Sequence, residues 1–188
     1  MHGPTVHDDI TRVLFSEEQI AQRVDELGQQ IAADYAEAVE RGEEIELVCL
    51  LRGSSIFTAD LARAIKLPVR MDFMCVSSYG NGVKSSGMVR IQKDLADDIA
   101  GKHVIIVEDV IDSGLTLKFI SKNLESRGPR SLEIAALVRK QLEGQADIRC
   151  KYQGFTCGDE FIVGYGLDYA ERYRNLAEVC VLDPKVYA

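Results

Sequence analysis

Residues 104–116 constrain the fold more than any other segment of this chain. They read Val-Ile-Ile-Val-Glu-Asp-Val-Ile-Asp-Ser-Gly-Leu-Thr. The apolar, β-branched run at 104–107 predicts a strand buried on both faces, and apolar residues at helical spacing from Leu117 to Leu124 predict a helix after it. Gly114 allows a tight turn between the two. The segment therefore predicts a strand–turn–helix unit.

The turn combines two opposed kinds of ligand-binding groups. The hydroxyls of Ser113 and Thr116, with the N–H groups of a helix start, favour a phosphate. Carboxylates repel phosphate, so Glu108, Asp109 and Asp112 must accept hydrogen bonds from hydroxyls, hold a divalent cation or take a proton. Binding a sugar phosphate requires all three: acceptors for its hydroxyls, a divalent cation and a group that takes a proton. The alternative is an ordinary turn capped by Asp112 and Ser113, with the acidic pair on a solvated rim.

The rest of the chain alternates between helix and strand signals. Residues 16–19 form a capping box, and apolar residues recur at helical spacing over 20–35 and 57–65. Residues 77–90 are rich in Ser and Gly and predict a loop. Short apolar runs predict strands at 45–51, 69–76, 132–138, 161–164 and 179–182. This order predicts an α/β protein with a mostly parallel, twisted sheet flanked by helices.

The predicted sheet also indicates where a ligand binds. In open α/β sheets, ligands sit at the carboxyl ends of the strands. Arg52-Gly53, the acidic pair and Lys140 all fall at such ends. We therefore expect these residues to share one site.

The composition narrows the class of protein. A chain of 188 residues suits one domain with a sizeable core. The net charge of −8 argues against broad binding of nucleic acid or anionic membranes. The first residues lack the apolar core of a signal peptide, and no apolar run approaches membrane-spanning length, so a cytoplasmic location is expected. Five cysteines without paired spacing predict reduced thiols, and no His–Cys cluster has zinc spacing.

Segment 104–116 closely resembles the phosphoribosyl-diphosphate motif of purine phosphoribosyltransferases, which belong to the type I phosphoribosyltransferase family. That motif is a strand ending in an acidic pair, then two apolar residues, Asp, Ser or Thr, Gly, any residue and Thr. The resemblance implies that the acidic pair engages the ribose hydroxyls and Mg²⁺, and that Asp112 is the general base for the purine N7 proton. The residues implied to bind the ribose and its 5′-phosphate are Glu108, Asp109, Asp112, Ser113, Gly114, Leu115 and Thr116.

Two earlier segments extend the resemblance. Residues 50–54 are similar to the family's diphosphate-binding loop, in which a non-proline cis peptide precedes the basic residue. This similarity implies that Arg52 and Gly53 bind diphosphate. Residues 76–80 resemble the start of the family's catalytic lid, which implies that Ser78 and Tyr79 belong to a lid that excludes water from a reactive ribosyl cation.

Later segments resemble the family's purine pocket. Lys140 stands where the family places the lysine that donates to a 6-oxo group, although the adjacent Arg139 leaves the register open by one residue. Phe161 is implied to stack on the purine, and the backbone carbonyls of Ile162 and Asp168 to accept from a 2-amino group. The Asp168 side chain is implied to reach Mg²⁺ through water, which makes the implied metal set Glu108, Asp109 and Asp168. Arg174 matches the family's second diphosphate-binding residue.

Together these segments are similar to bacterial hypoxanthine phosphoribosyltransferases. The resemblance implies a Mg²⁺-dependent purine salvage transferase. It would move the 5-phosphoribosyl group of phosphoribosyl diphosphate to N9 of hypoxanthine, and often also of guanine, giving IMP or GMP and diphosphate. The implied partners are phosphoribosyl diphosphate and a 6-oxopurine, with no nucleic acid and no membrane. The alternative is a non-catalytic operon regulator of the same fold that senses phosphoribosyl diphosphate, and the full purine pocket favours the enzyme.

The same resemblance implies an organisation. Residues 1–188 should form one phosphoribosyltransferase domain, with a small hood built from about 1–15 and 150–188. The chain should assemble as a homodimer or homotetramer.

Overall fold

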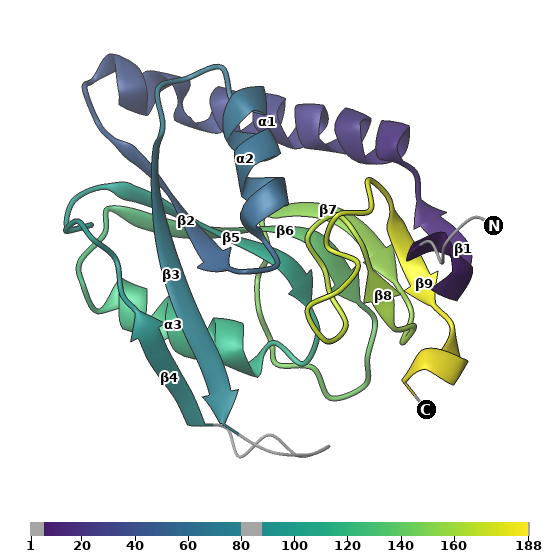
Figure 1. Cartoon of the computed structure of the whole chain (residues 1–188). Coiled ribbons are helices and arrows are strands. Elements are labelled where there is room, and N and C mark those ends of the chain that lie inside the picture. The colour runs from purple at the N-terminus through teal and green to yellow at the C-terminus, as the bar shows by residue number, and fades with distance from the viewer. Residues whose placement is uncertain (1–5, 80–87, 188) are drawn as a thin grey trace.

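The main sheet of the protein is a mostly parallel sheet, as predicted. The computed structural model describes residues 6–79 and 88–187. Its main sheet has six strands in the order β4-β3-β2-β5-β6-β7 (Figure 1). All neighbouring strands are parallel except β3 and β4, which are antiparallel. The strands are β2 (Ile45–Leu51), β3 (Arg70–Tyr79), β4 (Met88–Lys93), β5 (His103–Ile111), β6 (Ser131–Lys140) and β7 (Tyr152–Cys157).

Helices cover both faces of this sheet. Helices α1 (Glu17–Glu40) and α2 (Ser55–Ala64) lie on one face, and α3 (Leu115–Glu125) lies on the other (Figure 1). Successive residues of β5 point to opposite faces, so Ile105 packs with α1 and α2 whereas Ile106 packs with α3. Burial on both faces explains why the run at 104–107 is continuously apolar.

The start of α1 confirms the predicted capping box. The Ser16 hydroxyl accepts a hydrogen bond from the Gln19 backbone N–H, and the Gln19 side chain accepts one from the Ser16 N–H. Farther along α1, Gly28 lets the helix approach α2 closely, since a Cβ there would lie 2.6 Å from Ala64. The position of α2 is therefore set by its packing against α1.

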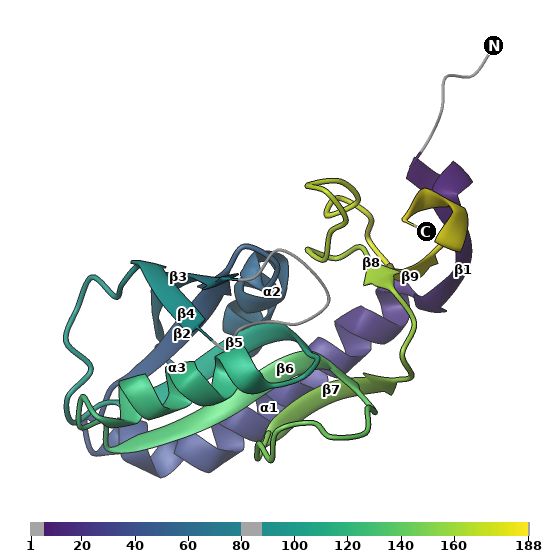
Figure 2. The same cartoon turned by 90° about the horizontal axis from the view of Figure 1, so that it is seen from below.

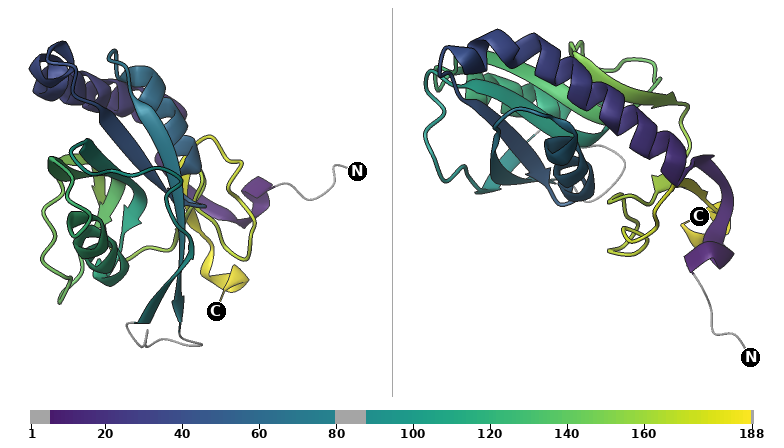
Figure 3. Two further views of the ribbon diagram at one scale, coloured as in Figure 1. Left: turned by 90° about the vertical axis from the view of Figure 1, so that its left-hand side faces the viewer. Right: turned by 90° about the horizontal axis from the view of Figure 1, so that it is seen from above.

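A second, three-stranded sheet joins the two terminal segments. It contains β1 (Ile10–Phe15), β9 (Val179–Leu182) and β8 (Ile162–Val163), in that order and antiparallel throughout. Short 3₁₀ helices, Val6–Asp9 and Pro184–Val186, flank it. Figure 2 shows this sheet beside the carboxyl-terminal part of the main one, and in Figure 3 α1 runs from it along the main sheet.

The expected hood boundary at 150 is wrong. Residues 152–157 form β7 and pair with β6 in the main sheet, where Tyr152 is fully buried. The carboxyl-terminal part of the small sheet begins only with β8. The run Tyr-Gln-Gly-Phe-Thr-Cys mixes polar and apolar residues, so its strand character is weak in the sequence.

The loop predicted over 77–90 is also partly wrong. Strand β3 continues through Tyr79 and pairs with β4, with Ser77 opposite Arg90. Strand β4 is an edge strand with charged and polar residues, and such strands carry little hydrophobic pattern. The predicted lid extends into residues 80–87, which lie outside the described part of the chain. Ser78 and Tyr79 are the last two residues of β3. Within the described ranges, no helix combines the length and apolarity needed to cross a membrane.

Candidate active site

The predicted sugar-phosphate residues meet at the carboxyl ends of β2 and β5, which are neighbours in the sheet. A cavity of about 320 Å³ opens there. It brings together most of the residues expected to bind ribose 5-phosphate and diphosphate. These are Arg52, Gly53, Glu108, Asp109, Asp112, Ser113, Gly114, Thr116 and Arg174, and Asp168 of the expected purine and metal sets lines the same cavity.

The acidic pair lies inside β5 rather than in the loop after it. Burial, and next the charge of the adjacent Asp109, raise the pKa of Glu108 well above its usual range. Gly53 of the neighbouring loop packs directly on this pair, because a Cβ there would overlap the Asp109 carboxylate. The solvated rim of the alternative interpretation therefore does not describe Glu108. A bound cation would reduce the repulsion between these two adjacent carboxylates, one of which has a raised pKa.

The turn after β5 is open to an anion. Gly114 is the N-cap of α3 with φ of 76°, a left-handed conformation that favours glycine. The N-cap Gly114 has no side chain, and the side-chain contact at this helix start is a long one, 3.5 Å from the Leu115 N–H to the Ser113 hydroxyl, so the cap expected in the alternative interpretation forms only weakly and through Ser113. Leu115 is 49% exposed and does not line the cavity. Only its backbone is therefore near enough to the turn to contact a ligand there.

The two predicted arginines are bridged by a residue that the sequence analysis missed. Arg52 follows a cis Leu51–Arg52 peptide, as the resemblance implied. Its guanidinium lies 2.8 Å from Oε2 of Glu171, and that of Arg174 lies 3.3 Å from the same atom. Arg174 also pairs with Asp168 at 2.9 Å. Glu171 is only three residues from Arg174, but nothing local in the sequence indicates its contact with Arg52.

Lys140, and not Arg139, faces the general-base candidate. The Lys140 Nζ lies 4.0 Å from Oδ2 of Asp112, whereas Arg139 donates to the backbone carbonyl of Ile148 at 3.0 Å. Gln145, also missed, donates from its side chain to the carbonyls of Asp112 and Lys140, the latter at 2.6 Å. This amide ties the end of β6 to the turn after β5. The geometry favours the register in which Lys140 contacts the purine.

The remaining purine residues lie on the small sheet, outside the cavity. Phe161 stacks on Tyr187 with ring centroids 4.9 Å apart, and Tyr169 meets it edge-on at 5.5 Å. Ile162 is buried in β8. Neither these residues nor Lys140 line the 320 Å³ cavity. The structure thus brings together the sugar-phosphate part of the predicted site, with Asp168, and places Lys140, Phe161 and Ile162 outside that cavity.

The carboxylates fit a jointly held magnesium ion. In the part of the chain that the structure describes, no three His, Cys, Asp or Glu side chains are grouped to hold a metal by themselves. Glu108, Asp109 and Asp168 are therefore not a protein-only cage. Mg²⁺ commonly uses one or two carboxylates together with substrate phosphates and waters. The adjacent Glu108 and Asp109, next to an anion-binding turn, match that pattern.

Comparison with known proteins gives the class. The phosphoribosyl transferase domain family matches residues 14–170. The chain belongs to this family, and its fold is the type I phosphoribosyltransferase fold.

Within the family, the chain is similar to hypoxanthine and hypoxanthine-guanine phosphoribosyltransferases. It is 52% identical to the hypoxanthine-guanine phosphoribosyltransferase of Mycobacterium tuberculosis, with 95% of this chain and 89% of that protein covered. The solved hypoxanthine phosphoribosyltransferase of Staphylococcus aureus superposes with a TM-score of 0.92 at 44% identity, over 100% of both chains. The enzyme of Trypanosoma cruzi superposes with a TM-score of 0.89 at 40% identity, over 98% and 97%.

Proposed function

We propose that this protein is a hypoxanthine phosphoribosyltransferase of purine salvage. It transfers the 5-phosphoribosyl group of phosphoribosyl diphosphate to N9 of hypoxanthine, and of guanine, and releases diphosphate. The observation that carries the proposal is that the acidic pair of β5 and the helix start at Gly114 line one cavity. The similarity to named hypoxanthine-guanine phosphoribosyltransferases over nearly the whole chain supports the same substrates.

The phosphate groups are bound at two places. The N–H groups and hydroxyls of residues 112–116 take the 5′-phosphate, because a helix start favours an anion. Arg174 and the Arg52-Gly53 loop take the diphosphate, for which the planar guanidinium is a good match. Glu171 contacts both guanidinium groups and Asp168 pairs with Arg174, so diphosphate binding requires these carboxylates to release the arginines.

The acidic pair holds the ribose and the metal. Glu108 and Asp109 accept hydrogen bonds from the ribose hydroxyls and, together with Asp168, would hold Mg²⁺. When bound, Mg²⁺ supplies positive charge that stabilises the departing diphosphate. The developing ribosyl cation is stabilised by the same carboxylates.

The purine is bound and deprotonated at the open side of the cavity. Lys140 donates to the 6-oxo group, which a protonated amine can do only for an acceptor. Asp112 takes the N7 proton as general base. The carbonyls of Ile162 and Asp168 accept from a 2-amino group. Phe161 stacks on the purine with the ring face that Tyr187 does not cover.

An assay with purified protein tests the function. Phosphoribosyl diphosphate, Mg²⁺ and each of hypoxanthine, guanine, xanthine and adenine are mixed, and nucleotide formation is followed by absorbance. We expect product with hypoxanthine and guanine, and none with adenine, whose 6-amino group cannot accept from Lys140. Phosphoribosyl-diphosphate binding without product from any base would support the regulator instead. Sedimentation of the same sample tests the proposed homodimer or homotetramer.

A further inference from the structure

The loop that carries Asp168 and Arg174 has an unusual backbone. In the described part of the chain, every non-glycine residue with a positive φ lies in loop 164–174. These residues are Tyr165 (49°), Ala170 (50°), Glu171 (63°) and Tyr173 (75°). Residues with L side chains adopt this region rarely and keep it only where the surrounding structure holds them. Loop 164–174 therefore needs specific contacts to keep its shape.

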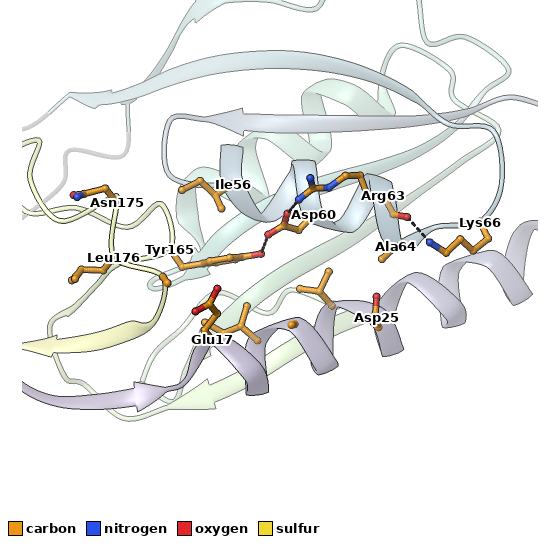
Figure 4. A pocket seen from close by; sticks show the side chains of 14 residues that line it. Glu17, Asp25, Ile56, Asp60, Arg63, Ala64, Lys66, Tyr165, Asn175 and Leu176 are labelled. Carbon is orange, nitrogen blue, oxygen red and sulfur yellow. Dashed lines mark hydrogen bonds and ion pairs between the residues drawn. The ribbon is translucent and has the colours of Figure 1, made fainter.

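Tyr165 connects the loop to helix α2. Its side chain is 6% exposed, and its hydroxyl donates to the carboxylate of Asp60 on α2, as Figure 4 shows. Asp60 in turn pairs with Arg63 on the surface of the same helix. The ring and this hydrogen bond line a second cavity, of about 510 Å³, between α1, α2 and the loop. Burial, and next the hydrogen bond to Asp60, raise the pKa of Tyr165, so the phenol keeps its proton and remains a donor.

The next residue joins the loop to the diphosphate site. A Cβ on Gly166 would overlap the carbonyl oxygen of Gly53, so the two backbones are in direct contact. Arg174 donates from its guanidinium to the Gly166 carbonyl at 2.8 Å, and the Gly166 N–H donates back to the Arg174 carbonyl at 3.0 Å. The chain from Gly53 leads within two residues into α2, which carries Asp60. Tyr165 and Gly166 thus fix loop 164–174 to α2 and to the loop before it at adjacent points.

We propose that the Tyr165–Asp60 hydrogen bond is a clasp that positions Arg174 against the Arg52-Gly53 loop and so sets the affinity for diphosphate groups. This inference rests on the proposed function, because phosphoribosyl diphosphate is the ligand that both loops would hold. Tyr165 and Asp60 do not line the 320 Å³ cavity. They are positioning residues that act through loop 164–174.

The chain offers a matched control for a purely structural role. Tyr152 is fully buried in β7, and its hydroxyl donates to Asp34 of α1 at 2.8 Å. Neither of these residues lines the 320 Å³ cavity. Tyr152→Phe and Tyr165→Phe each remove one hydroxyl that a buried tyrosine donates to an aspartate. Both variants should lower the melting temperature, and only Tyr165→Phe should alter the diphosphate site.

The first measurement is the KM for phosphoribosyl diphosphate at saturating hypoxanthine and Mg²⁺. The loss of one hydrogen bond should raise this KM about three- to tenfold in Tyr165→Phe and less than about twofold in Tyr152→Phe. Asp60→Asn keeps a carbonyl oxygen that accepts from the phenol, so it should retain a KM close to that of the wild type. Asp60→Ala removes the acceptor and should behave like Tyr165→Phe.

The second measurement needs no substrate. The backbone N–H group of Tyr165 donates to the carbonyl of Leu176, and that of Gly166 donates to the carbonyl of Arg174. Their hydrogen exchange should be faster in Tyr165→Phe and unchanged in Tyr152→Phe. Unchanged exchange in Tyr165→Phe would overturn the clasp. Faster exchange with an unaltered KM would overturn its link to diphosphate. If the wild type transfers no phosphoribosyl group, the proposed function fails, and exchange alone then decides the clasp.

Discussion

Strand β5 joins two regions whose charges are arranged in opposite ways. At its amino end, His103 binds Glu43 at 2.8 Å and Ser131 at 2.7 Å, so each polar group meets a complementary partner. Near its carboxyl end, Glu108 lies beside Asp109, and like charges are neighbours. Six residues or fewer separate these environments on one strand. The difference therefore comes from the side chains that surround each end of β5.

The amino end is arranged for stability. Glu46 is 1% exposed, and its carboxylate lies 3.0 Å from Lys102 and 3.3 Å from Arg70. The hydrogen bond from Arg41, and next that from His103, lower the pKa of Glu43 to about 2. Buried charges are tolerated where partners complete their hydrogen bonds, which is the case here.

The carboxyl end keeps charges that the protein alone does not balance. The pKa of Glu108 is raised by burial and by Asp109. The two arginines contact Glu171, and Arg174 also pairs with Asp168, so carboxylates occupy the groups that are proposed to bind diphosphate. Perturbed groups of this kind gather at functional sites because a ligand supplies the missing charge. Variants at the carboxyl end should therefore alter binding and turnover, and variants at the amino end should alter stability.

Asp112→Asn should give the largest effect. Asparagine keeps the shape of the side chain but cannot take a proton. A positioned general base typically contributes about 10²–10⁴-fold. We expect kcat to fall by that order while the melting temperature and the affinity for phosphoribosyl diphosphate change little. Turnover within a few fold of the wild type would remove Asp112 from the role of base.

Lys140→Ala should give the next largest effect. It removes the charged donor to the 6-oxo group, and a hydrogen bond to a charged group contributes about 1.5–3 kcal/mol. This corresponds to a rise of roughly 10- to 150-fold in the KM for hypoxanthine. Binding of phosphoribosyl diphosphate, measured by titration, should stay nearly intact. Arg139→Ala is the control, and this phenotype in Arg139→Ala alone would shift the register by one residue.

Lys102→Met tests the amino end. The side chains of Lys102 and Glu46 are 14% and 2% exposed, so Glu46 would keep only Arg70 as a close partner. Removing one member of a buried pair is strongly destabilising, and we expect a loss on the order of 3 kcal/mol in the free energy of unfolding. Urea denaturation measures it. An unchanged kcat in the folded variant is part of the prediction, and a large loss of kcat would break the contrast between the two ends.

Glu43→Gln should show a smaller effect that depends on pH. The folded-state pKa of Glu43 is about 2, below its usual 4.5. The charged form therefore stabilises the protein above pH 4.5, and this contribution is lost as the pH falls from 4.5 towards 2. The variant should be less stable than the wild type at pH 7, and the difference should shrink in that window. A difference that is the same at pH 7 and pH 3 would contradict the assigned pairing.

The sequence predicted those parts of the molecule whose signals are local. The run at 104–107 must be apolar because both of its faces are covered, and the box at Ser16 is a pattern of four adjacent residues. The turn at 112–116 was recognised because the groups that bind one phosphate come from consecutive residues. Such features depend on short segments of sequence and can be predicted without knowledge of the tertiary structure.

The features that were missed depend on distant contacts. Tyr165 and Asp60 are 105 residues apart, and Glu171 and Arg52 are 119 residues apart. No spacing rule relates such positions before the fold is known. The stacking of Phe161 on Tyr187, 26 residues later in the chain, was likewise not foreseen, and the role of Phe161 in stacking on a purine stays a prediction. The edge strand β4 was missed because its exposed side carries polar residues.

The central claim is that Glu108 and Asp109 form a charge-unbalanced pair that a cation and phosphoribosyl diphosphate complete together. Without a cation, two carboxylates oppose a polyanionic ligand. With Mg²⁺ between them and the ligand, the same carboxylates become favourable partners. The double variant Glu108→Gln, Asp109→Asn removes the repulsion and the attraction at once, so its binding should depend less on the metal.

Calorimetric titration of the wild type with phosphoribosyl diphosphate, in Mg²⁺ and in chelator, tests this claim most directly. We predict tight binding in Mg²⁺ and binding at least tenfold weaker in chelator, a difference of about 1.4 kcal/mol or more. In the double variant, the two conditions should give more similar affinities. Equal affinities in the wild type would mean that the turn and the arginines hold the ligand alone, and would contradict the account.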